Sequence, residues 1–190
     1  MRVAMFGGTF DPVHIGHLFI ADEVKTRLGY DRVVFVPTYQ PPHKPDKPQA
    51  SGDQRREMLR LALNGRADMV VDSWELDRAQ VSYTIETVRH LYENMDVEGK
   101  LGLIIGDDLA TDFDSWRDAE TLLEEVDLII AHRQGEELPE GMEAFASIDN
   151  SPMPVSSSEI RERVRSGKAF RYLVTESVYV FIREHNLYQN

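Results

Sequence analysis

The chain has 190 residues, with 21 Lys and Arg against 33 Asp and Glu and no Cys. This length favours one domain, and 42% apolar with 28% charged residues is typical of a globular protein. The absence of Cys excludes disulfides, Cys-ligated zinc, iron–sulfur clusters and Cys nucleophiles. The net charge of −12 argues against partners that are duplex DNA, bulk RNA or anionic membrane surfaces. An anionic ligand would therefore need a local group of donors.

Short apolar runs alternate with amphipathic stretches along the chain. The runs predict strands at residues 2–6, 32–37, 69–74, 101–105 and 127–132. The amphipathic stretches predict helices at residues 14–28, 53–64, 84–95 and 115–125. Several of the strands are unbroken apolar runs, as expected of strands that are buried on both faces. The sequence thus predicts an α/β fold, a Rossmann-like parallel sheet with helices on both faces.

The C-terminal residues 155–190 have a different pattern. They predict two helices, at 159–166 and 176–185, with no strand between them. We therefore expect a single domain, 1–190, made of a core (1–154) and a C-terminal helical cap. Residues 40–50, with four of the nine prolines, and the acidic residues 134–142 predict surface loops. The charges at 53–56 are interpreted as a solvated face or caps, and no apolar run approaches the length of about 20 residues that spans a bilayer.

The first strand is followed by GGTFDPVHIGHL, residues 7–18. This is neither the dinucleotide GxGxxG fingerprint nor the GxxxxGK[ST] phosphate loop. Gly7 and Gly8 allow close approach of a ligand, His14 and His17 share one face of the first helical turn, and Gly16 leaves room between them. Together with a helix N-terminus, these residues favour a polyphosphate ligand. A zinc-binding His pair and two unrelated surface histidines are the alternatives.

A second candidate segment is VSSSEIRERVRSG, residues 155–167. Ser156 and Glu159 have capping-box spacing, so a well-capped surface helix is one interpretation. That interpretation does not require the further hydroxyls of Ser157 and Ser158, or Arg161 one turn in. Hydroxyls and a guanidinium beside a helix start predict a second anion site.

The combination of H-x-G-H with the late S-S-S-x-I-R resembles the nucleotidyltransferase superfamily and, more narrowly, the bacterial nicotinate-nucleotide adenylyltransferases. The resemblance extends to PPHK (41–44), SYTIET (82–87), IGDD (105–108), DFDSW (112–116) and the closing YLVTESVYVFIREHNLY (172–188). The family usually has Thr at the position of Ser158, which keeps the hydroxyl.

The resemblance implies a role for each matching residue. It places His14, His17 and Arg161 in catalysis. The implied contacts of the ATP phosphates are Gly7, Gly8, Thr9, Phe10, Ser157, Ser158 and Arg161. The implied contacts of the mononucleotide are Lys44, with His43 beside it, for the phosphate, Tyr83 and Thr84 for the pyridine carboxylate, Trp116 for ring stacking and Asp108 for the ribose. The simpler alternatives are a core position for Trp116, helix capping by Tyr83 and Thr84, and a solubilising charge at Lys44.

The implied reaction transfers the adenylyl group of ATP to nicotinate mononucleotide, giving nicotinate adenine dinucleotide and pyrophosphate in NAD biosynthesis. Mg²⁺ is expected on the ATP phosphates, with no metal-ligating residues of the protein, and His14, His17, Lys44 and Arg161 are expected to supply positive charge. We expect a cytoplasmic enzyme that binds neither nucleic acid nor membrane and that could form a homo-oligomer. The alternatives are adenylyl transfer to nicotinamide mononucleotide or pantetheine phosphate, and a catalytically silent nucleotide-binding module.

Overall fold

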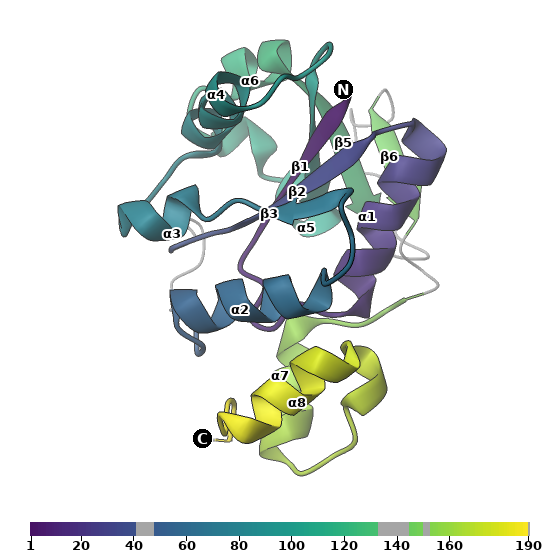
Figure 1. Ribbon diagram of the computed structural model, residues 1–190. Helices are drawn as coiled ribbons and strands as arrows, with labels where there is room; N and C mark the ends of the chain where they lie inside the picture. The colour runs from purple at the N-terminus through teal and green to yellow at the C-terminus, as the bar shows by residue number, and fades with distance from the viewer. Residues whose placement is uncertain (41–47, 133–144, 150–152, 190) are drawn as a thin grey trace.

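The computed structural model describes residues 1–40, 48–132, 145–149 and 153–189 (Figure 1). Its centre is a six-stranded sheet in which every neighbouring pair is parallel, in the order β3-β2-β1-β4-β5-β6. The strands are Val3–Gly8 (β1), Arg32–Pro37 (β2), Met69–Val71 (β3), Leu101–Gly106 (β4), Val126–His132 (β5) and Ala146–Asp149 (β6). The predicted Rossmann-like parallel sheet is confirmed.

Helices cover both faces of the sheet, as predicted. In Figure 1, α4 and α6 lie on one side of the sheet, and α1 and α2 lie on the other side together with the C-terminal α7 and α8. The helices are Ile15–Leu28 (α1), Gly52–Ala62 (α2), Trp74–Arg78 (α3), Thr84–Asn94 (α4), Asp107–Ala110 (α5), Ala119–Glu125 (α6), Ser157–Arg165 (α7) and Glu176–Glu184 (α8). Short 3₁₀ turns occupy Phe113–Ser115 and Arg171–Leu173.

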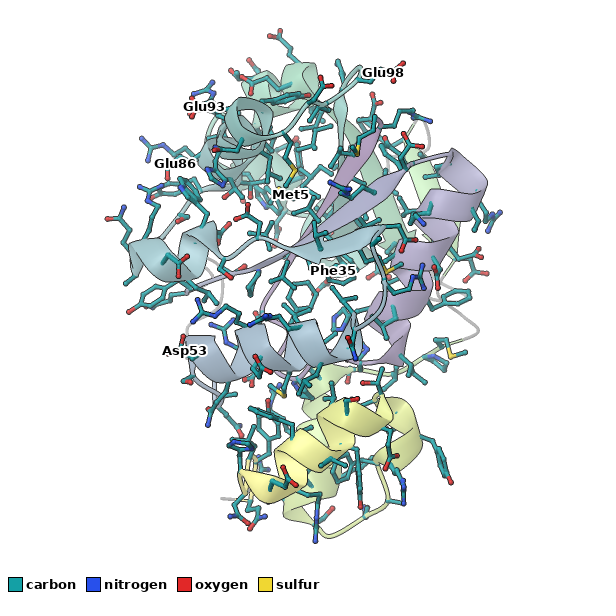
Figure 2. All side chains as sticks on the ribbon, in the orientation of Figure 1. Met5, Phe35, Asp53, Glu86, Glu93 and Glu98 are labelled. Atoms are coloured by element: carbon teal, nitrogen blue, oxygen red, sulfur yellow. The ribbon has the colours of Figure 1, made fainter. Side chains whose placement is uncertain are left out.

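The alternation of side chains along each strand divides the interior into two hydrophobic clusters. Phe6 and Phe35 belong to the cluster under α1, α2, α7 and α8, which we call the lower core. Met5 and Val34, one position away on the same strands, belong to the cluster under α4 and α6, the upper core. Figure 2 shows Met5 and Phe35 on opposite sides of the sheet. Because both faces are covered, the strands are continuous apolar runs.

Three local predictions were wrong. Residue 74 does not end a strand, because the Asp72 side chain accepts the backbone N–H of Trp74 at 2.9 Å, a turn that starts α3 instead. The single helix predicted at 115–125 is a 3₁₀ turn followed by α6, with Asp118 in the left-handed region at φ 56° between them. Strand β6 was missed because only Ile148 of its four residues is buried, so it shows no apolar run.

The C-terminal residues form the predicted helical cap, with no strand among residues 153–189. Ile160 of α7 and Val178 and Ile182 of α8 belong to the lower core, so the cap shares its interior with the sheet. None of the helices in the described part of the chain combines the length and the apolar character that a membrane crossing requires.

Ile182 is fully buried on α8, the cap helix that contacts α2. We expect Ile182→Ala to lower the free energy of unfolding by about 2–5 kcal/mol, because the truncated side chain leaves a cavity. Val180→Ala on the same helix is the control, since Val180 is 40% exposed and its truncation should cost less than about 0.5 kcal/mol. Urea denaturation of both variants measures the difference. Equal losses would mean that the cap does not contribute to the core.

Candidate functional site

The sheet topology creates a crevice between β1 and β4. The strand order reverses direction there, and ligands of open parallel sheets bind outside the carboxyl ends of the strands at such a point. A pocket lies at this place, which we call the switch-point pocket. Its cavity volume is about 140 Å³, and the pocket opens to solvent. Its lining includes Gly7, Gly8, Thr9, Thr38, Glu75, Ser82, Tyr83, Thr84, Trp116 and Arg117.

Two stacked histidines mark the start of α1. His14 is the N-cap residue, and its ring lies 3.6 Å from the ring of His17, centroid to centroid. The backbone N–H of His14 donates to Nδ1 of His17 at 3.2 Å. Because Nδ1 of His17 is an acceptor, the proton of its neutral ring is on Nε2, which is left to donate to a ligand.

Both histidines are neutral in this structure at pH 7. Burial lowers the pKa of His14 to about 3, and burial together with His14 lowers the pKa of His17 well below its ordinary value. Without a ligand, these side chains therefore carry no positive charge, and the expectation that they supply one concerns the complex with a polyphosphate. They enter the site as hydrogen-bond donors, and a bound polyphosphate would shift both pKa values upward.

Gly16 and Phe10 have roles in packing. We had expected Gly16 to leave room for a ligand. A Cβ at Gly16 would lie 3.1 Å from Nδ1 of His14 and from a methyl group of Val155, so this glycine instead accommodates protein side chains. The ring of Phe10, predicted to face the ATP phosphates, is 2% exposed and packs edge-on against His17 with centroids 5.0 Å apart. The Phe10 side chain positions His17 and is not available to a ligand.

The second predicted anion site is joined to the first by direct hydrogen bonds. Arg161 donates to the backbone carbonyl of Asp11 at 2.8 Å and to Oγ of Ser158 at 3.2 Å. The hydroxyl of Ser157 donates to the carbonyl of Pro12 at 2.9 Å. Ser156 caps α7 by accepting the N–H of Glu159 at 3.1 Å, as predicted. The structure thus brings the starts of α1 and α7 together, although they are about 140 residues apart in the sequence.

One end of the switch-point pocket is formed by the start of α4, whereas the side chains at the starts of α1 and α7 are not among its lining residues. Tyr83 is its N-cap residue by position, but its side chain makes no capping hydrogen bond, so the simple capping interpretation does not hold for Tyr83. The first N–H groups of α4 therefore lack a side-chain cap at a point where Tyr83 and Thr84 line the pocket. Trp116 lines the same pocket, half-buried and packed against Phe113. Trp116 thus has one surface in the upper core and another toward the pocket.

Of the predicted mononucleotide contacts among the described residues, Asp108 does not line the pocket. Asp108 follows β4 as predicted, but its side chain is exposed, folds over Gly106 and does not line the pocket. Lys44, together with His43, lies outside the described residues. The described part of the chain also contains no group of three or more His, Asp or Glu side chains arranged to hold a metal ion.

Sequence reasoning missed three charged residues at the site. Arg117 lies over the ring of Tyr83, 4.4 Å from its centroid, and Glu75 is 5% exposed in the wall of the pocket. Arg55, which we had assigned to a solvated face, is 1% exposed. Its guanidinium donates to the carbonyls of Thr9 at 2.7 Å and Thr38 at 2.8 Å, so it joins the loops that follow β1 and β2. The only available signal was the position of Arg55 in an amphipathic helix, which does not identify a buried charge.

Comparison with known proteins agrees with this architecture. A family model described as cytidylyltransferase-like matches residues 5–163. The chain is 41% identical to a protein of Borreliella burgdorferi over 99% of this chain and 97% of the relative. It is 36% identical to a protein of Treponema pallidum over the whole of both chains, and both relatives are named "probable nicotinate-nucleotide adenylyltransferase". The fold is similar to that of the Plasmodium falciparum nicotinic acid mononucleotide adenylyltransferase complexed with NaAD, with a TM-score of 0.77, 20% identity and coverage of 98% and 97% of the two chains.

We expect Arg55→Met to lower the free energy of unfolding by about 2–5 kcal/mol, because it leaves the carbonyls of Thr9 and Thr38 without their buried donor. Arg56→Met is the matched control. The Arg56 side chain is 35% exposed and pairs with Asp53 and Asp77 at the surface, so its loss should cost less than about 1 kcal/mol. Urea denaturation compares the two, and a loss for Arg55→Met no larger than that of the control would contradict the positioning role.

Proposed function

The chain belongs to the cytidylyltransferase-like family and, within it, to the nicotinate-nucleotide adenylyltransferases, and on this basis we propose that it transfers the adenylyl group of ATP to nicotinate mononucleotide. The products are nicotinate adenine dinucleotide and pyrophosphate. The observation that supports this most strongly is the joining of two donor groups, His14 with His17 and Ser157 with Arg161, through the backbone carbonyls of Asp11 and Pro12 in the turn that follows β1. Such a grouping suits a polyphosphate in a protein whose net charge is −12.

In the proposed reaction, an oxygen of the mononucleotide phosphate attacks the α-phosphorus of ATP. The new O–P bond forms as the bond between the α-phosphorus and the bridging oxygen breaks, and pyrophosphate leaves with the electron pair. A phosphate monoester is already anionic at neutral pH, so no general base is needed. Catalysis then consists of positioning two anions and stabilising the charge that moves onto the leaving group.

The residues at the starts of α1 and α7 have distinct tasks in this mechanism. Nε2 of His17 donates to a phosphate oxygen, and the fixed tautomer means that it is ready to do so without a proton transfer. Arg161 supplies a permanent positive charge, and its hydrogen bond to Asp11 keeps it beside the turn that follows β1. The described residues include no carboxylate cage, which fits a Mg²⁺ ion held by the ATP phosphates and water.

The pyridine of the mononucleotide is proposed to occupy the end of the pocket at the start of α4. The N–H groups at Tyr83 and Thr84 suit a carboxylate, since anions are favoured at helix starts. Trp116 presents an aromatic face for stacking, and Arg117 adds a cation at the same end. Lys44 remains a candidate for the mononucleotide phosphate.

Pyrophosphate release tests this function directly. We expect release with ATP, Mg²⁺ and nicotinate mononucleotide, and a kcat/KM about 5- to 150-fold lower with nicotinamide mononucleotide, because the amide NH₂ faces donors. Phosphopantetheine should give no release. No pyrophosphate with any acceptor would reject the function in favour of a silent nucleotide-binding module, and equal kcat/KM for the two pyridine nucleotides would reject the preference.

We expect His17→Ala and Arg161→Ala each to lower kcat by about 10²–10³-fold, the scale for removing one donor that stabilises charge in a transition state. His185→Ala and Arg163→Ala are matched controls. His185 is exposed at the end of α8, and Arg163 lies on α7 but pairs with Glu159 at the surface. Steady-state kinetics and thermal melting should show that the controls keep wild-type turnover. Wild-type turnover in a folded His17 or Arg161 variant would assign that residue no catalytic role.

A further inference from the structure

Glu75 is a buried carboxyl group in the wall of the pocket that is proposed to receive a second carboxylate, that of the pyridine. It is 5% exposed and lines the switch-point pocket together with Ser82, Tyr83 and Thr84. The mechanism above gives Glu75 no task. A carboxyl group that is only structural is not expected in this place, because two carboxylates in one poorly solvated pocket repel each other.

The surroundings of Glu75 hold it in place without neutralising it. One carboxyl oxygen, Oε1, accepts a hydrogen bond from the hydroxyl of Thr87 on α4 at 2.7 Å. Arg78 on the same helix has a favourable charge, but it is paired with Glu86 at 3.2 Å and lies over the Trp74 ring. Arg78 lowers the pKa of Glu75, whereas the negative charges of Asp72 and Glu86 raise it.

From the other side, Arg55 of α2 is also close enough to interact with Glu75, but its guanidinium is committed to the carbonyls of Thr9 and Thr38. With its charged neighbours paired elsewhere, burial dominates and raises the pKa of Glu75 to about 7. Near neutral pH, the carboxyl group therefore exists in both protonation states.

Ser82 gives a second, independent sign that this part of the pocket is built for a polar ligand. Its hydroxyl is buried and has no hydrogen-bond partner among the described residues, and Ser82 lines the same pocket as Glu75. Buried polar groups are normally satisfied, so an unsatisfied one in a pocket wall indicates a missing ligand group. The Ser82 hydroxyl and the N–H groups at the start of α4 can donate to a carboxylate or to the carbonyl of an amide, so they do not distinguish the two ligands. The carboxyl group of Glu75 can distinguish them.

We propose that Glu75 determines the acceptor preference of the pocket, with its neutral carboxyl group admitting a pyridine carboxylate and its ionised form favouring the carboxamide. The neutral group removes the repulsion between two carboxylates, and its O–H can itself donate a hydrogen bond to the ligand. The ionised group can accept a hydrogen bond from the amide NH₂ instead. The inference rests on the proposed function and adds a residue that sets its specificity.

The first test is the ratio of kcat/KM for nicotinate mononucleotide to that for nicotinamide mononucleotide, measured from about pH 6.5 to about pH 8.5. Both substrates carry the same phosphate, so its titration near pH 6 cancels in this ratio. We expect the ratio to fall about 10-fold as Glu75 loses its proton. Glu75→Gln should make the ratio constant within about 2-fold, since Gln keeps the shape and the acceptor for Thr87 but cannot ionise.

Asp77→Asn is the matched control. Asp77 lies on the same helix, but its side chain is 67% exposed and pairs with Arg56, so its loss should leave the pH dependence unchanged. A constant ratio in the wild-type enzyme, or a ratio that still falls in a folded Glu75→Gln variant, would overturn the proposal.

The second test needs no turnover and no variant. Because binding of the pyridine carboxylate requires neutral Glu75, calorimetry at about pH 8 in buffers of different ionisation enthalpy should show uptake of about 0.5–1 proton more with nicotinate than with nicotinamide mononucleotide. Equal proton uptake, or no binding of either nucleotide, would overturn the proposal. Absence of pyrophosphate release together with this difference in uptake would reject the proposed reaction and leave the assignment of Glu75 standing.

Discussion

Asp11 is the residue on which the arrangement of the site depends. Its backbone carbonyl accepts from Arg161, and its buried carboxylate accepts from the backbone N–H groups of Gln49 and Ala50 and from the hydroxyl of Tyr188 at 2.7 Å. Four segments that are far apart in the chain therefore meet at one residue. Three hydrogen-bond donors compensate the carboxylate for the water that it loses on burial. The same hydrogen bonds fix the loop that leads into His14.

This arrangement explains how an acidic protein can offer a site for anions. The donors are either neutral, as in the two histidines, or held by backbone carbonyls, as in Arg161 and Arg55. None of the salt bridges among the described residues involves His14, His17 or Arg161, so these three side chains keep hydrogen-bonding capacity for a ligand. The guanidinium of Arg55 is instead committed to the carbonyls of Thr9 and Thr38. Several carboxylates of the described residues are paired with other Arg side chains at the surface.

The sequence predicted the sheet, the order of its elements and the residues at the starts of α1 and α7 because these depend on local patterns. Apolar runs, glycine turns and capping residues can be recognised without knowledge of the fold. The burial of Arg55 and Glu75 depends on which helices pack over the loops, and neither residue type nor spacing indicates it. The low pKa values of His14 and His17 have the same origin, since desolvation is a property of the folded surroundings. Asp108 shows the converse, because its motif was recognised but its side chain does not line the pocket.

The division of the interior by the sheet has an evolutionary consequence. Phe10, Val13 and Ile160, which support the starts of α1 and α7, belong to the lower core, whereas Tyr83 and Trp116 pack on the upper core. The half of the site that is proposed to bind the nucleotide phosphates and the half that is proposed to bind the acceptor are thus built on separate packing units. Mutations that reshape the acceptor half can accumulate without repacking the other half. One ancestral phosphate site can in this way be inherited intact by descendants that use different acceptors.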